Sequence, residues 1–138
     1  MNKILGFDDV NGIISAQAGC ILDDLDNYCN STGFQMPYNI GSRGSCMLGG
    51  NLATNCGGTR MLRHGSLRAN TVGLEAVLAN GTIIRDMSAI RKDNSGYDIK
   101  QLFVGSEGSL GVITEAALRC PIKAQAKHLA YLAVNNFD

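Results

Sequence analysis

Glycine is concentrated in one short segment of this chain, between Gly49 and Gly58. These ten residues hold four glycines, two asparagines and a threonine. Because glycine has no Cβ, its main-chain N–H groups can come close to a ligand, and successive N–H groups on a tight loop form a concavity for anions. Asn51, Thr54 and Asn55 add side-chain donors and acceptors. The segment predicts a ligand-binding loop; the alternative is a flexible surface loop, because glycine-rich loops are common.

A second polar, glycine-rich segment runs from Gly105 to Gly111 and directly precedes a predicted strand. Two such segments, about 50 residues apart and each next to regular structure, suit an extended nucleotide cofactor better than a single phosphate. Neither segment matches the dinucleotide fingerprint G-x-G-x-x-G or the P-loop pattern. The sequence therefore favours a nucleotide site outside the two common nucleotide-binding folds.

The composition is that of a globular protein. The chain has 138 residues, of which 45% are hydrophobic, enough for one domain with a moderate core. Twelve basic and twelve acidic residues give a net charge of zero, and no cluster of Lys and Arg predicts binding to nucleic acid. No apolar stretch has the length of a membrane span. The segment before the first acidic residues is too short for a signal or transit peptide.

The cysteines and histidines are too scattered to predict a metal site. None of the five cysteines forms a Cys-x-x-Cys pair, and His64 and His128 lie far apart in the sequence. An odd number of cysteines without close spacing predicts reduced thiols. Cys56 lies inside the first glycine-rich segment and could be a reactive thiol, but we favour a small space-filling residue there.

Hydrophobic patterning predicts a mixture of strands, hairpins and helices, which is the α+β class. An amphipathic helix is predicted over 21–31, with Asp23, Asp24 and Asp26 on the face opposite its apolar residues and Gly33 as its stop. A short helix is predicted over 98–103. The predicted strands cover 4–7, 13–18, 72–79, 82–86, 111–118 and 128–134.

Two of these strands are predicted to form a hairpin. Asn80-Gly81 is a strong signal for a two-residue turn between the strands over 72–79 and 82–86. No internal repeat, low-complexity tract or linker divides the chain, so we expect a single domain.

The segment from Gly44 to Gly58 resembles the FAD-binding segment of the vanillyl-alcohol-oxidase type flavoproteins, and most resembles their D-lactate and D-2-hydroxyglutarate dehydrogenase branch. Further stretches agree, namely 65–67, 73–75, 80–82, 91–98 and 105–114. The run Arg91-Lys92-Asp93-Asn94-Ser95-Gly96-Tyr97-Asp98 is similar to the D-2-hydroxyglutarate members in particular, and the D-lactate members are the second choice. The similarity covers nearly the whole chain, and this combination of motifs is highly specific.

The resemblance implies an FAD site. Residues 49–58 match the loop that wraps the flavin and its linking chain, Gly65 matches a glycine packed close to the cofactor, and the segment around Glu107 matches the part that reaches the adenosine half. No residue is given a catalytic or metal-binding role. The implied cofactor-binding residues are Gly49, Gly50, Asn51, Thr54, Asn55, Gly58, Gly65, Glu107, Gly111 and Ile113.

The resemblance also implies a fold and a reaction. The expected fold is the second half of a vanillyl-alcohol-oxidase type FAD-binding domain, a mixed sheet with flanking helices. The implied reaction oxidises D-2-hydroxyglutarate to 2-oxoglutarate and reduces FAD, whose electrons then pass to an acceptor. The expected partners are a small 2-hydroxy acid and that acceptor, and no nucleic acid is expected to bind. No membrane-spanning segment is expected. A mitochondrial location is implied by the resemblance alone.

Two parts of the family pattern lie outside this sequence. A glycine-rich pyrophosphate loop is expected upstream of Ile4, and a substrate domain is expected after Asp138. We therefore interpret residues 1–138 as a partial FAD-binding domain from the middle of a longer enzyme, and we expect the isolated chain to be inactive. The alternative is a non-catalytic remnant or an interaction module.

Several other residues have two interpretations. Some members of the superfamily attach FAD covalently through a histidine, but the branch resembled here does not, so we expect no covalent bond at His64. Residues 91–93 could hold substrate or form a solvated loop that docks another domain. Tyr97 is expected to be a packed aromatic residue with its hydroxyl satisfied. Glu107 is expected to lie on the cofactor side and not to act as a base.

Overall fold

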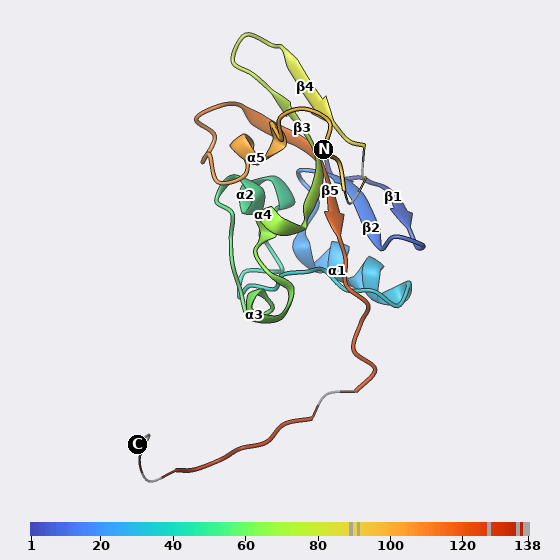
Figure 1. Ribbon diagram of the computed structural model, residues 1–138, viewed down its shortest axis with the longest axis vertical. Coiled ribbons are helices and arrows are strands. Elements are labelled where there is room, and N and C mark those ends of the chain that lie inside the picture. The colour runs from blue at the N-terminus through green and yellow to red at the C-terminus, as the bar shows by residue number, and fades with distance from the viewer. Residues whose placement is uncertain (89, 91, 127, 135, 137–138) are drawn as a thin grey trace.

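A five-stranded sheet lies at the centre of the structure, a computed structural model that describes residues 1–88, 90, 92–126, 128–134 and 136. The strand order is β1-β2-β5-β3-β4, and every neighbouring pair is antiparallel (Figure 1). The predicted α+β class is confirmed. The strands are β1 (Ile4–Asp8), β2 (Ile13–Gln17), β3 (Thr71–Val77), β4 (Ile83–Asp86) and β5 (Val112–Arg119). The helices are α1 (Leu22–Ser31), α2 (Leu48–Ala53), α3 (Met61–His64), α4 (Leu67–Asn70) and α5 (Lys100–Phe103).

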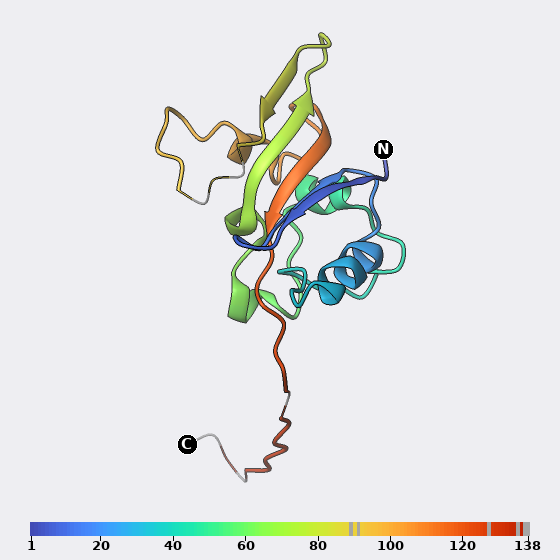
Figure 2. The ribbon, with the colours of Figure 1, turned by 90° about the vertical axis from the view of Figure 1, so that its right-hand side faces the viewer.

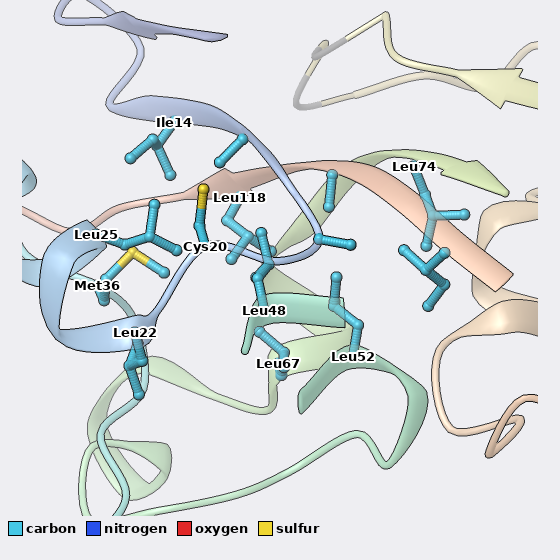
Figure 3. Close-up of a cluster of buried hydrophobic side chains, with 14 of the residues drawn as sticks. Ile14, Cys20, Leu22, Leu25, Met36, Leu48, Leu52, Leu67, Leu74 and Leu118 are labelled. Carbon is cyan, nitrogen blue, oxygen red and sulfur yellow. The ribbon is translucent and has the colours of Figure 1, made fainter. Parts of the chain in front are cut away.

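One face of the sheet carries the main core. Residues that alternate along β2, β5 and β3 point to this face, as the period of a strand requires. They pack against apolar residues of α1 and α2, which lie on the same side of the sheet (Figure 2). Figure 3 shows this cluster, in which Ile14, Leu25, Leu48, Leu74 and Leu118 are at most 1% exposed. Burying each such side chain contributes roughly 1.5–3 kcal/mol.

Helix α1 forms where its hydrophobic spacing predicts it. Its apolar side chains Leu22, Leu25 and Cys29 are buried, and Asp23 and Asp24 lie in the first turn, where negative charge is favourable. The predicted stop is confirmed, because the chain leaves the helix through Gly33 at φ 84°.

The first glycine-rich segment is not a loop throughout, because its first half forms α2. Glycine is needed in this helix for packing: a Cβ at Gly49 would lie 2.7 Å from the Cβ of Ala18, and the Gly49 N–H donates to the Ala18 carbonyl at 2.7 Å. The main chain of α2 therefore packs directly against the backbone that follows β2. Local sequence gives no sign of this contact, since glycine disfavours helices.

The hairpin of β3 and β4 exists, but its turn lies one residue earlier than predicted. The Gly81 N–H donates to the Leu78 carbonyl, so Ala79 and Asn80 are the central residues. Gly81 follows at φ 83°, which makes this the longer hairpin loop with a glycine after a tight turn.

The predicted strand over 128–134 is wrong. These described residues have no regular structure, and the chain runs away from the sheet after β5 (Figures 1 and 2). Leu129 and Tyr131 are 94% and 95% exposed. Alternating apolar residues form a strand only when they pair with a neighbouring strand, and 128–134 pairs with none of the five strands of the sheet.

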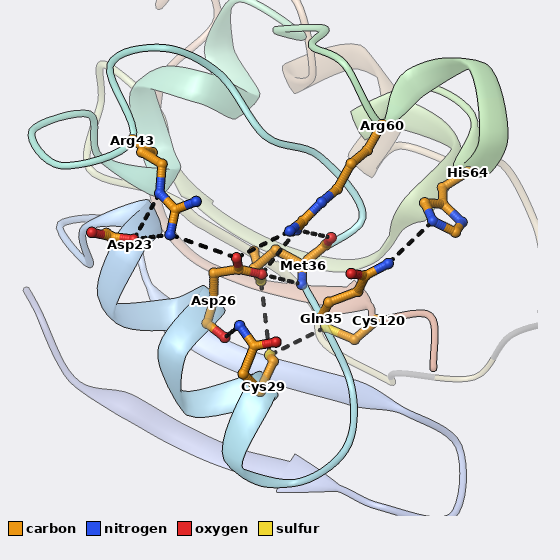
Figure 4. Close-up of polar contacts among 10 residues, drawn as sticks. Asp23, Asp26, Cys29, Gln35, Met36, Arg43, Arg60, His64 and Cys120 are labelled. Carbon is orange, nitrogen blue, oxygen red and sulfur yellow. Dashed lines mark hydrogen bonds and ion pairs between the residues drawn. The ribbon is translucent and has the colours of Figure 1, made fainter. Parts of the chain in front are cut away.

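A buried carboxylate joins α1 to the rest of the molecule. Asp26 was expected opposite the apolar face of α1, but it is only 4% exposed, so that prediction is wrong. Its carboxylate accepts from Arg60 at 2.9 and 3.2 Å and from the Met36 N–H at 2.9 Å (Figure 4). The Arg60 guanidinium also donates to the Met36 carbonyl at 2.8 Å. Arg43 lies at 3.9 Å and pairs with Asp23.

The surroundings of Asp26 favour its ionised form. Burial by itself would raise the pKa of this carboxyl, but the hydrogen bonds from Arg60 and Met36 and the charges of Arg60 and Arg43 outweigh burial, so the pKa is lowered. A pKa that is lower in the folded state means that this carboxylate stabilises the fold above its ordinary pKa of 3.8. The contribution is lost as the pH falls through the folded value.

We predict that Arg60→Ala lowers the free energy of unfolding by about 3–5 kcal/mol near neutral pH, because it leaves the buried Asp26 carboxylate without its ion pair. Urea unfolding followed by circular dichroism measures this. The loss should shrink at pH values below the folded pKa of Asp26, where the carboxyl is neutral in both proteins.

Arg43→Ala is the matched control. The Arg43 side chain is 38% exposed and its partner Asp23 is equally exposed, so we expect a loss of at most about 1 kcal/mol. Equal losses for the two variants would show that the buried ion pair has no special role.

Candidate functional site

Both glycine-rich segments meet at one hollow on the surface, which we call the glycine hollow. It has a volume of about 320 Å³ and lies between α2, the start of β5 and the N-terminus. Four of the residues expected to bind cofactor line it, namely Gly49, Gly50, Gly111 and Ile113. The other lining residues are Met1, Ala18, Gly19, Met47, Ala53, Gly108 and Val112. The fold therefore brings residues of both glycine-rich segments together at one place on the surface.

The glycines around this hollow have two different roles. At Gly49 and Gly111 a Cβ would lie 2.7 Å from the Ala18 Cβ and 2.6 Å from the Val77 carbonyl oxygen, so both are required for close packing within the protein. At Gly50 a Cβ would meet no atom within 4 Å. Gly50 therefore keeps space open beside the main chain, which is what close approach of a ligand requires.

Main-chain hydrogen bonds join the second glycine-rich segment to the end of α2. The Gly105 N–H donates to Leu52 at 2.9 Å, and the Glu107 N–H donates to Ala53 at 2.8 Å. Glu107 adopts φ 51°, a left-handed conformation that is costly for a residue other than glycine. Such strain is typical of segments held in place for function. The Glu107 side chain is exposed.

The polar side chains of the first segment contact the protein itself. Asn51 is 6% exposed, and its amide donates to the Tyr38 hydroxyl at 3.0 Å and lies 3.4 Å from the Cys46 sulfur. The Thr54 hydroxyl donates to the Gly50 carbonyl at 3.1 Å. The Asn51 contacts hold α2 against the core, and the Thr54 bond closes the end of the helix. Any contact between these side chains and a cofactor stays a prediction.

Asn55 holds the chain after α2. It adopts φ 46°, which asparagine tolerates better than most residues, and its side-chain oxygen accepts from the Arg68 N–H at 3.0 Å. Arg68 in turn donates from its guanidinium to the carbonyls of Gln101 and Val104. The segment 55–58 is thus connected to both α4 and α5.

Gly58 and Gly65 do not line the glycine hollow. Gly58 packs so closely on the Asn39 carbonyl that a Cβ would lie 2.1 Å from its oxygen. Gly65, at φ 81°, ends α3 and turns the chain into α4, whose first turn is capped by the Ser66 hydroxyl. Close packing requires Gly58, and the turn from α3 into α4 requires Gly65. Their roles beside a cofactor stay predictions.

The remaining predictions about single residues have different outcomes. Burial raises the pKa of the Cys56 thiol to about 11, which agrees with a space-filling residue and not with a reactive thiolate. Tyr97 is 95% exposed, so the expectation of a packed aromatic residue is wrong: its loop projects into solvent. Lys92 and Asp93 are exposed, as expected of a solvated loop, and Arg91 lies outside the described residues.

The structure contains a second hollow that the sequence analysis did not predict, which we call the cationic hollow. It has a volume of about 420 Å³ and brings His64 and His128, distant in sequence, to one site. The adjacent basic residues of the run Arg60-Met61-Leu62-Arg63-His64 were the available signal. The hollow is lined by Gln35, Thr59, Arg60, Arg63, His64, Ala124, Ala126 and His128.

The described residues contain no group of three or more His, Cys, Asp or Glu side chains that could hold a metal ion. Among the same residues, every helix is too short or too polar to cross a membrane.

Known proteins are similar to this chain over nearly its whole length. D-2-hydroxyglutarate dehydrogenase from mitochondria of Bos taurus is 52% identical over 137 residues, which are 99% of this chain and 25% of that protein. The corresponding protein of Danio rerio is 50% identical over 138 residues, 26% of its length. A putative mitochondrial D-lactate dehydrogenase of Schizosaccharomyces pombe is 45% identical over 138 residues. The chain thus spans about a quarter of these relatives.

Solved structures share the fold. Alkyldihydroxyacetonephosphate synthase superposes with a TM-score of 0.79 at 28% identity, over 91% of this chain and 22% of that protein. Residues 1–86 match the family described as the FAD binding domain. The resemblance to vanillyl-alcohol-oxidase type flavoproteins is confirmed by these similarities: the chain belongs to the FAD-binding domain family.

Proposed function

We propose that residues 1–138 are part of the FAD-binding domain of a longer D-2-hydroxyglutarate dehydrogenase, which oxidises D-2-hydroxyglutarate to 2-oxoglutarate. The observation that carries the proposal is the glycine hollow, where Gly50 leaves open space beside α2 and the second glycine-rich segment forms the opposite wall. The dehydrogenases of Bos taurus and Danio rerio, half identical to this chain, support the choice of reaction.

The lining of the glycine hollow supports binding of one part of an FAD molecule, its flat ring system. Ala18, Met47, Ala53 and Val112 give it apolar walls, which suit the faces of aromatic rings. The open side of Gly50 allows a flat group to approach the main chain where a side chain would block it. The apolar walls and the strained Glu107 nearby support a cofactor site, and a volume of about 320 Å³ has room for one part of an FAD molecule.

We assign the cofactor contacts to two sets of residues. The main chain at Gly50 and Gly108 would face the cofactor directly, while Asn51 and Asn55 would hold the first segment in position through Tyr38 and Arg68. The full proposed set is Gly49, Gly50, Asn51, Thr54, Asn55, Gly58, Gly65, Glu107, Gly111 and Ile113. The adjoining side chains of Ala53 and Val112 would keep water from the bound group.

FAD, when bound, supplies the acceptor for the hydride that leaves the carbon bearing the hydroxyl group. The part played by this chain is to bind and orient the cofactor. We assign no proton transfer to its residues: the resemblance places Glu107 on the cofactor side and not as a base, and Cys56 is held as a neutral thiol. The substrate, its electron acceptor and a mitochondrial location belong to the proposal for the whole enzyme.

A D-lactate dehydrogenase is the second candidate. It is favoured by the Schizosaccharomyces pombe relative, a putative D-lactate dehydrogenase that is 45% identical over the entire chain. A Saccharomyces cerevisiae relative named as a D-2-hydroxyglutarate–pyruvate transhydrogenase is 42% identical, and it suggests a 2-oxo acid as one class of electron acceptor. A non-catalytic remnant is the remaining alternative.

We predict that Gly50→Val weakens FAD binding about tenfold or more in the native full-length protein, of which residues 1–138 are part. A branched side chain would fill the open space beside α2, and overpacking of that kind costs about 1–3 kcal/mol. Flavin content after gel filtration and fluorescence titration with FAD measure the change.

Gly41→Val is the control for this experiment. A Cβ at Gly41 also meets open space, and this residue lies outside both the segment 44–58 and the lining of the glycine hollow. FAD binding should stay at the wild-type level in Gly41→Val. If Gly50→Val binds FAD as tightly as its control, the glycine hollow is not the cofactor site.

We predict that the native polypeptide reduces its flavin faster with D-2-hydroxyglutarate than with D-lactate, and not with either L-enantiomer. Anaerobic mixing with each acid at several concentrations, followed by flavin absorbance, gives the rate constant of flavin reduction and the Kd for that acid. A preference for D-lactate would favour the second candidate, and no reduction by any of the acids would favour the non-catalytic remnant.

A further inference from the structure

Three sulfur atoms from distant parts of the sequence meet inside the protein, in a group that we call the sulfur cluster (Cys29, Met36 and Cys120). The Cys29 Sγ lies 3.6 Å from the Cys120 Sγ and 3.9 Å from the Met36 Sδ (Figure 4). Cys29 belongs to α1, Met36 to the chain that follows this helix, and Cys120 is the residue after β5. The function proposed above uses none of the three.

The sulfur cluster is closed to water. The exposed fractions of Cys29, Met36 and Cys120 are 0%, 0% and 3%. A single buried cysteine is commonly no more than a small space-filling residue. Here two thiols and a thioether converge from three segments of the chain, and these are the soft donor groups that bind metal ions when their sulfurs lie close together.

The three donors differ from those of a structural zinc site. Such a site has four ligands taken from Cys, His, Asp and Glu, whereas the sulfur cluster contains two cysteines and completes its set with a thioether. Thiolate and thioether together are ligands that select Cu(I). The chemistry of the donors therefore favours a soft monovalent cation.

We propose that the sulfur cluster binds one Cu(I) ion through the thiolates of Cys29 and Cys120 and the thioether of Met36. Two sulfurs bonded to one ion at about 2.3 Å, with an angle of about 120° between the bonds, lie about 4 Å apart. The distances of 3.6 and 3.9 Å are already close to that value, so the side chains need only small shifts to enclose the ion.

Binding balances as an exchange of protons for the metal ion. Two S–H bonds break, two copper–thiolate bonds and one copper–thioether bond form, and two protons pass to water without any transfer of electrons. The loaded site carries one net negative charge. Arg60, which also pairs with Asp26, donates from its guanidinium to the Met36 carbonyl at 2.8 Å, so a positive charge lies beside the site to offset it.

A bound ion would join three separate parts of the fold. It would link α1 to the chain at Met36 and to the end of β5, and it would stabilise the folded protein because the unfolded chain does not hold these sulfurs together. Entry of the ion requires local opening. The chain over 121–123 meets 33–35 through a few main-chain hydrogen bonds next to the cluster, and short contacts of this kind open most readily.

The test is an anaerobic titration of the native full-length protein with Cu(I), in competition with bicinchoninate, a chelator that is coloured when it holds Cu(I). We expect the wild type to bind one more Cu(I) ion per chain than Cys29→Ala or Cys120→Ala does. Cys20→Ala is the matched control, because Cys20 is a buried cysteine, 4% exposed, outside the sulfur cluster. It should bind as many copper ions as the wild type.

Met36→Leu tests the third ligand with little change in volume, so this variant keeps its fold. We expect its affinity for Cu(I) to fall about tenfold or more, since disturbing even an outer partner of a metal ligand has an effect of that size. X-ray absorption at the copper edge should show three sulfur neighbours for this ion in the wild type and two in Met36→Leu.

Three outcomes would overturn the inference. They are equal copper binding by the wild type and both cysteine variants, the same sulfur neighbours and affinity in Met36→Leu as in the wild type, and tighter binding of Zn(II) than of Cu(I) at the cluster. If circular dichroism shows that the cysteine variants are unfolded, Met36→Leu decides. Failure to bind FAD would contradict the proposed function and leave this inference standing.

Discussion

The buried ion pair of Asp26 and Arg60 is the interaction on which the arrangement of the first 64 residues depends. The carboxylate comes from α1, the guanidinium from the residue before α3, and both bond to the main chain at Met36. A buried carboxylate is tolerated only when its oxygens are paired, so the three segments cannot move independently. The same contact fixes Arg60 at the wall of the cationic hollow, and α1 in turn supports the core beneath β2 and β5.

Close approach of backbones is the second constraint, and it builds the glycine hollow. Gly49 brings α2 against the chain after β2, and Gly111 brings the start of β5 against the Val77 carbonyl. With these two glycines committed to packing, Gly50 is left facing open space. One short segment thus provides both the contact that places α2 and the gap beside it. This is why composition alone could not separate the glycines needed for packing from the one that faces open space.

Local sequence predicted most of the fold. Strands β1 and β2, helix α1 with its glycine stop, the β3–β4 hairpin and β5 all follow from hydrophobic period and turn residues. The failures share a cause, which is dependence on distant partners. Helix α2 exists because the core holds Leu48 and Leu52, the segment 128–134 has no neighbouring strand to pair with, and Asp26 is buried because Arg60 reaches it from 34 residues away.

The sequence by itself determined the α+β class, the two glycine-rich segments and the family to which they belong, because turn chemistry and motif spacing are local properties of the chain. Only the tertiary structure decided which of those residues line the same hollow, because that depends on α2 lying beside the start of β5. It also decided that Asn51 faces the core and that His64 and His128 meet beside Arg63. Long-range packing, and not any pattern along the chain, sets the direction in which each polar side chain points.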